Sequence, residues 1–139
     1  MAAMQQTDRL RELADLVPVL EAPDADFGHW DNEPLPDGSI HMPWFVPGAT
    51  EDAFRKAVGQ GGWIVTGFDW MQWLQTDEGR SLRDDPAAVA TASPDQLGML
   101  LTAIIRSDRF TEGSIAGAFE SGLLARIARR ATALLEEQA

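Results

Sequence analysis

The strongest constraint on the fold is the apolar pattern between residues 93 and 135. The stretch Ser93-Pro94-Asp95-Gln96 predicts a helix start, because the serine can cap the first turn, the proline suits the first helical position and the glutamine completes a capping box. Apolar residues then recur at helical spacing in two runs: Leu97, Leu100, Leu101, Ile104 and Ile105, then Ile115, Phe119, Leu123, Ile127, Ala131 and Leu135. Gly122 interrupts the second run, so we expect a short helix followed by a longer terminal helix.

A further helix is predicted near the amino end. Apolar residues from Leu10 recur at helical spacing, Thr7 can cap the start, and Pro18 and Pro23 bracket the end. Residues 1–6 are polar, and we expect them to be disordered.

Two aromatic runs, FGHWD (27–31) and IHMPWF (40–45), predict two antiparallel strands. The turn signal Pro36-Asp37-Gly38 lies between them. Because Pro43 has no backbone N–H to donate, the second strand should be an edge strand or contain a bulge.

The remaining segments complete the predicted architecture. Thr50 is expected to cap a helix, residues 62–65 (GWIV) to form a third strand, Asp69 to start a short helix, and residues 85–92 to include one helical turn. The fold class is therefore α+β, with four or five helices packed around a small antiparallel β-sheet made of the hairpin plus one short strand, in a single globular domain spanning residues 1–139.

Charge and composition limit the function. The net charge is −11, and no lysine or arginine lies between Glu12 and Phe54, which argues against nucleic acid as a partner. The absence of cysteine excludes disulfides and thiolate metal sites or catalysis. The sequence contains no run of about 18 apolar residues, the length that a membrane-spanning helix needs, so we expect no membrane span. We expect a cytoplasmic protein that needs no cofactor.

Common enzyme signatures, such as a GxxxxGK[ST] phosphate loop, HExxH, GxSxG or GxGxxG, do not occur in the chain. His29 and His41 lie on the two predicted strands and could share a metal or a proton if they face each other; a structural or exposed position is the preferred interpretation. Asp69, Trp70 and Trp73 could form a stacking platform for a planar ligand, or the tryptophans could be core residues.

The stretch RSDRFTEGSIAGAFESG (106–122) contains the main candidate site. Arg106 and Arg109 project together if the preceding helix continues that far, and Glu112 lies near the start of the next helix. With Glu120 as a possible general base, these residues could clamp an anionic ligand. The alternative is that arginine–glutamate pairs fasten the corner between the helices, above a core filled by Phe110 and Phe119.

These residues also carry a resemblance to a known family. The pattern IRxxRFxEGxxAxxFExG (104–122), with MPWF (42–45) and FDWxxW (68–73) upstream, resembles a bacterial family catalogued as a domain of unknown function. The resemblance extends from about Val17 to Leu135. It implies motif membership for Arg106, Arg109, Glu112 and Glu120, and it implies no activity.

Two functions follow as hypotheses. The first is a non-catalytic accessory or binding protein that recognises a small anion or a protein partner through the Arg/Glu corner. The second is a small hydrolase-like enzyme that uses Glu112 or Glu120 as a base, with Arg106 and Arg109 as an anion clamp. Nucleic-acid binding is a distant third, limited to Arg126, Arg129 and Arg130, which are expected to form a solvated helical face.

Overall fold

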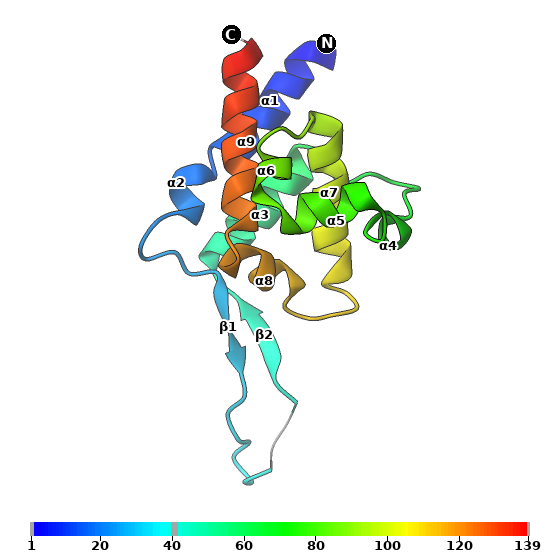
Figure 1. The fold of residues 1–139 in the computed structure, drawn as a ribbon. Helices are drawn as coiled ribbons and strands as arrows, with labels where there is room; N and C mark the ends of the chain where they lie inside the picture. Colours follow the sequence, from blue (N-terminus) through cyan, green and yellow to red (C-terminus); the bar gives the residue numbers. More distant parts are fainter. Residues whose placement is uncertain (1, 40–41, 139) are drawn as a thin grey trace.

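The computed structural model describes residues 2–39 and 42–138 and consists of a helical body with a two-stranded arm (Figure 1). The helices are α1 (Ala2–Ala14), α2 (Val17–Leu20), α3 (Ala49–Gln60), α4 (Trp70–Trp73), α5 (Asp77–Asp84), α6 (Pro86–Val89), α7 (Pro94–Ser107), α8 (Ser114–Glu120) and α9 (Leu123–Gln138). Strands β1 (Gly28–Asp31) and β2 (Trp44–Pro47) form the arm. The α+β class is confirmed, but there are more helices than the four or five expected.

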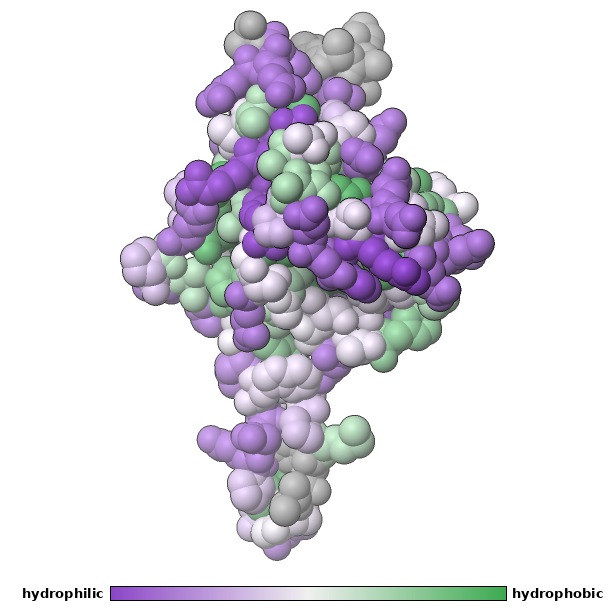
Figure 2. Space-filling view, in the orientation of Figure 1, coloured by the Kyte–Doolittle hydropathy of each residue, from purple (hydrophilic) through white to green (hydrophobic). Residues whose placement is uncertain are grey.

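The body is built around the long helices. Helix α1 lies beside α9 so that both ends of the chain are at the same end of the body, opposite the arm (Figure 1). Figure 2, in the same orientation as Figure 1, shows hydrophilic side chains over much of the visible surface of the body. Inside the body, apolar residues of α1, α3, α7, α8 and α9 form the core together with Trp63 from the segment after α3. Its largest fully buried side chains include Trp63, Phe54, Leu10, Leu101, Leu124 and Ile127.

Three of the predicted helix boundaries are confirmed. Ser93 and Gln96 form the predicted capping box at the start of α7. Gly122, at φ +84°, separates α8 from α9 as expected. Asp69 caps α4, because its Oδ1 accepts a hydrogen bond from the Gln72 N–H at 3.1 Å.

Two predicted caps are wrong. Helix α1 begins at Ala2, so Thr7 lies inside it and donates a hydrogen bond to Gln138 of α9 at 3.0 Å. Helix α3 begins after Gly48, and Thr50 turns inward, where its hydroxyl accepts the Asp26 N–H at 3.1 Å. In both places a tertiary contact takes the hydroxyl that was expected to cap a helix.

Helix α5 was missed because its sequence, DEGRSLRD, is almost entirely polar. Its start is nevertheless well specified, since the Thr76 hydroxyl accepts the Gly79 N–H at 3.1 Å. Gly79 also allows close packing: a Cβ there would lie 2.1 Å from the carbonyl oxygen of Trp73.

The predicted hairpin is confirmed and the predicted third strand is not. The strands β1 and β2 pair antiparallel, with Trp30 opposite Phe45 and Asp31 opposite Trp44. Among the described residues the sheet has only these two strands. Residues 62–65 pack instead on α7, where the Val65 N–H donates to the Thr102 hydroxyl at 2.8 Å, so a side chain supplies the acceptor that a neighbouring strand would have supplied.

Candidate functional site

The candidate site is the connection between α7 and α8, which we call the α7–α8 corner (residues 106–114). Helix α7 ends at Ser107, so Arg106 lies in its last turn and Arg109 lies beyond it. The chain then turns at Gly113, whose φ of +93° favours glycine, and α8 begins at Ser114. The two arginines are therefore not stacked on one continuous helix.

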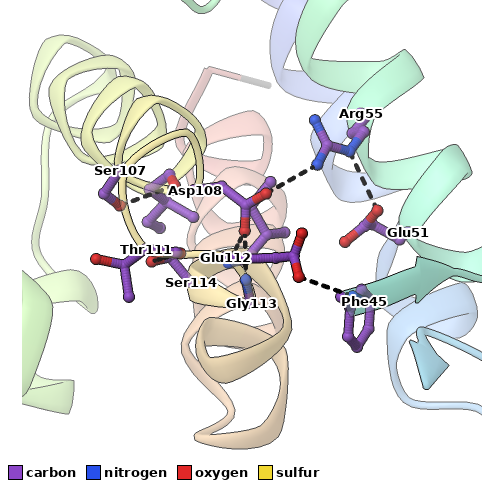
Figure 3. A network of polar contacts seen from close by, with 11 residues as sticks. Phe45, Glu51, Arg55, Ser107, Asp108, Thr111, Glu112, Gly113 and Ser114 are labelled. Atoms are coloured by element: carbon purple, nitrogen blue, oxygen red, sulfur yellow. Dashed lines mark hydrogen bonds and ion pairs between the residues drawn. The ribbon is translucent and has the colours of Figure 1, made fainter. Parts of the chain in front are cut away.

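Asp108 organises the corner from within (Figure 3). Its Oδ1 accepts hydrogen bonds from the N–H groups of Gly113 at 3.0 Å and Ile115 at 3.2 Å. These are donors at the start of α8, which the N-cap residue, Gly113, cannot satisfy with a side chain. Asp108 thus caps α8 from outside the helix.

The same aspartate connects the corner to α3 through Arg55. Asp108 Oδ2 lies 3.4 Å from Arg55 Nη2, and Arg55 Nε lies 3.2 Å from Glu51 Oε2 (Figure 3). The Glu51 side chain is only 3% exposed, and burial raises the pKa of its carboxyl group, although Arg55 opposes the shift. The ion pairs of this region are therefore Glu51–Arg55 and Arg55–Asp108.

Glu112 attaches the arm to the body. Its Oε1 accepts the backbone N–H of Phe45 in β2 at 3.0 Å, which occupies a donor on that edge of the hairpin (Figure 3). Beside it, a Cβ on Gly113 would lie 2.5 Å from Trp30 Cζ2 of β1, so the indole packs directly on the glycine backbone. Each strand of the arm therefore contacts one of two adjacent corner residues: β2 contacts Glu112 and β1 contacts Gly113.

The arginines and Phe110 lie on the outside of the corner. Among the described residues, neither Arg106 nor Arg109 forms a salt bridge, and Arg109 is exposed. Phe110 was expected in the core if the corner were fastened by Arg–Glu pairs. It is instead 74% exposed, and its ring is tilted against that of Trp70, with centroids 6.0 Å apart. Phe119 is half-buried and packs against the core, where its ring stacks on Phe27 with centroids 4.4 Å apart.

The other predicted site residues lie in separate surroundings. Glu120 is exposed at the end of α8, and no hydrogen bond of its side chain is seen within the described parts of the chain. Trp73 is buried and donates its indole N–H to Glu78 at 2.7 Å, so it is a core residue. Trp70 is half-buried beside Phe110, and Asp69 is exposed at the cap of α4.

The predicted histidine pair can be followed only at His29. His29 is exposed and lies opposite Val46 in the sheet, and His41 lies outside the described residues. Within residues 2–39 and 42–138, no group of three or more histidine, aspartate or glutamate side chains is placed to hold a metal ion.

The described cavities reach the corner only at two serines, Ser107 and Ser114. One of about 300 Å³ is lined by apolar residues of α7 together with Ser107, Ser114 and Arg83. None of the cavities described is lined by Arg106, Arg109, Glu112 or Glu120. Arg106 and Arg109 therefore lie outside the described cavities, and Arg109 and Phe110 are exposed to solvent.

Sequence reasoning missed the residues that carry the internal contacts. Glu51 and Arg55 are four residues apart in EDAFR, a spacing that brings side chains together on a helix. Asp108 lies between the two arginines, and its role was not predicted. Its position five residues before Gly113 does not identify a cap, since caps are recognised next to the helix they serve.

The fold and site define an α+β protein with a helical body and a hairpin arm held by a helix corner. The chain belongs to DUF6508, a family of unknown function, which it matches over residues 5–137. Neither the curated proteins nor the solved structures contain a significant match to it. None of the helices in the described ranges combines the length and the apolar character needed to cross a bilayer.

Proposed function

We propose that the protein is a non-catalytic binding protein and that the outer face of the α7–α8 corner docks a protein partner. The observation that carries the proposal is Phe110, which is 74% exposed on a loop whose backbone is fixed by Asp108. Exposing a large aromatic side chain to water is unfavourable. A fixed loop that holds it outward is suited to an interface anchor.

Charge complementarity indicates the kind of partner. Arg106 and Arg109 precede Phe110 in the same corner, and neither has a carboxylate partner among the described residues. Arginine and aromatic residues dominate the binding energy of many interfaces. The partner should therefore present an apolar side chain for the ring with aspartate or glutamate beside it for the guanidinium groups.

A protein segment fits this face better than a small anion. Small-molecule sites are concave and bury most of the ligand, whereas none of the described cavities is lined by either arginine.

From the resemblance to a bacterial family we infer that the protein binds its partner in the bacterial cytoplasm.

The hydrolase-like alternative has no specific observation in its favour. It needs Glu112 or Glu120 to act as a base next to Arg106 or Arg109. Glu112 accepts the Phe45 N–H at 3.0 Å, and neither glutamate pairs with those arginines among the described residues.

The test is a selection from a random peptide library on the immobilised protein, repeated on two corner variants. We expect binders that contain an aromatic or aliphatic residue flanked by acids, and we expect Phe110→Ser and Arg109→Glu each to weaken their binding at least about tenfold. Leu35→Ser is the matched control, because Leu35 is also an exposed apolar residue but lies in the turn of the arm.

Two results would contradict the proposal. One is a set of selected peptides without acidic residues. The other is unchanged binding to Phe110→Ser. A thermal shift with inorganic phosphate that disappears in Arg109→Ala would point instead to a small anion as the ligand of this face.

A further inference from the structure

A second site with arginines lies in a cleft between α6 and α9. Helix α6 packs against α9 (Figure 1), and the cleft beside their contact has a volume of about 240 Å³. Three of its lining residues are arginines of α9: Arg126, Arg129 and Arg130. Two of these guanidinium groups pair with carboxylates, Arg129 with Glu21 and Arg130 with Glu137, so within the described structure the unmatched positive charge at the cleft belongs to Arg126.

The expectation of a solvated arginine face holds for Arg129, whose side chain is 63% exposed, but not for Arg126 and Arg130, which are partly buried. The Arg130 side chain is 12% exposed, and its Nε donates to the Ala92 carbonyl oxygen at 2.8 Å. Arg129 forms a two-pronged contact with Glu21 of the segment that follows α2. These contacts position two of the guanidinium groups along the cleft.

Arg126 has the least satisfied guanidinium group of the three. Its Nη1 donates to the Ser121 carbonyl oxygen at 3.2 Å, and its Nε is buried without a hydrogen-bond partner among the described residues. Arg130 pairs with Glu137 and Arg129 with Glu21, but Arg126 has no carboxylate partner in the described structure. A guanidinium group has five N–H donors, so Arg126 retains capacity for an added acceptor.

The rest of the cleft is apolar. Pro86 and Ala90 line it from the α6 side and Ala133 from α9. The volume is below the roughly 300–1,000 Å³ typical of sites for drug-sized ligands, so a bound molecule must be small. An arginine edge beside apolar walls matches a molecule with an anionic head and a compact apolar body.

We propose that the α6–α9 cleft binds a small organic anion, with its carboxylate or phosphate group on Arg126 and its apolar part against Pro86, Ala90 and Ala133. Both head groups fit because the planar fork of a guanidinium group donates two parallel hydrogen bonds to either. The site is independent of the α7–α8 corner, and either can fail without the other.

The test is calorimetric titration of the full chain with four matched probes: hexanoate, hexyl phosphate, hexan-1-ol and inorganic phosphate. We expect one or both of the first two to bind, with the stronger identifying the head group, and the last two to bind at least about tenfold more weakly. In wild-type protein the side-chain Nε–H signal of Arg126 should shift in the nuclear magnetic resonance spectrum on binding.

Variants locate the bound probe. Arg126→Met keeps the aliphatic part of the side chain and should weaken binding at least about tenfold. Ala133→Leu should do the same by filling the cleft, with every arginine retained. Arg11→Met is the control, since Arg11 is an exposed arginine of α1 that pairs with Asp8 at 3.5 Å.

Three results would overturn the proposal. The first is no binding of either amphiphilic anion to the wild type at millimolar concentration. The second is binding that survives in folded Arg126→Met and Ala133→Leu, which would place the probe elsewhere. The third is inorganic phosphate binding as tightly as hexyl phosphate, since the apolar walls would then contribute nothing.

Discussion

The inner and outer sides of the α7–α8 corner use neighbouring residues for different purposes. On the inner side, Asp108 and Glu112 accept backbone N–H groups from α8 and β2. On the outer side, Arg109 and Phe110 are exposed. The difference teaches that opposite charges close together in a sequence need not pair, because backbone donors compete for the carboxylates.

The largest expected effect is on the inner side. Asp108→Ala removes two hydrogen bonds at the start of α8 and the contact with Arg55, and it should lower the free energy of unfolding by about 2 kcal/mol. Urea denaturation measures this. Glu120→Ala is the control, an exposed glutamate of the same helix, and should change stability by less than about 0.5 kcal/mol. Equal losses of unfolding free energy in Asp108→Ala and Glu120→Ala would contradict a structural role for the inner carboxylate.

The contact between the arm and the corner should show the next largest effect. Gly113→Ala places a methyl group at a φ of +93° and 2.5 Å from Trp30, and should cost about 1–2 kcal/mol for the backbone alone. Gly38→Ala is a matched control, because Gly38 has a φ of +87° with open space around it. Thermal unfolding should show the greater loss for Gly113→Ala, and its tryptophan emission should change as Trp30 is displaced. A loss no greater than that of Gly38→Ala would contradict the contact.

The buried carboxyl group of Glu51 on α3 predicts a pH dependence of stability. Burial raises the pKa of Glu51 in the folded state, so its contribution to stability is greatest at low pH and is lost as pH rises through that pKa. Glutamine cannot ionise. Glu51→Gln should therefore gain stability relative to the wild type between about pH 4 and about pH 7, by less than the effect of Gly113→Ala. Urea denaturation at both values checks this, and a relative loss with rising pH would be inconsistent with a carboxyl group destabilised by burial.

The smallest effect on stability is expected on the outer side. Arg106→Gln and Arg109→Gln should each change the free energy of unfolding by less than about 0.5 kcal/mol, since neither arginine has a salt-bridge partner among the described residues. Chemical denaturation of both variants is sufficient. A loss above about 1 kcal/mol in either would give that arginine a structural role.

The sequence was sufficient where local signals agree with tertiary packing. The capping box at Ser93, the break at Gly122 and the two-stranded hairpin were all predicted, because each depends on residues close together in the chain. The prediction failed where a distant partner decides the outcome, as for Thr50, whose hydroxyl is taken by the Asp26 N–H. It also failed for the strand at 62–65, which packs on a helix instead of a sheet.

The same limit applies to the site. The corner was found from its cluster of charges, but the roles within it depend on contacts across 53 residues to Arg55 and 67 residues to Phe45. Short-range spacing contains no information about such partners. That the arginines act in binding stays a prediction.

Amide hydrogen exchange tests the central claim most directly, because it reports on the two backbone contacts separately. In Glu112→Ala the Phe45 amide should lose protection while the Ile115 amide keeps it, and in Asp108→Ala the Ile115 amide should lose protection while Phe45 keeps it. If each variant lost protection at both amides, or at neither amide, the two carboxylates would not hold the arm and α8 as described.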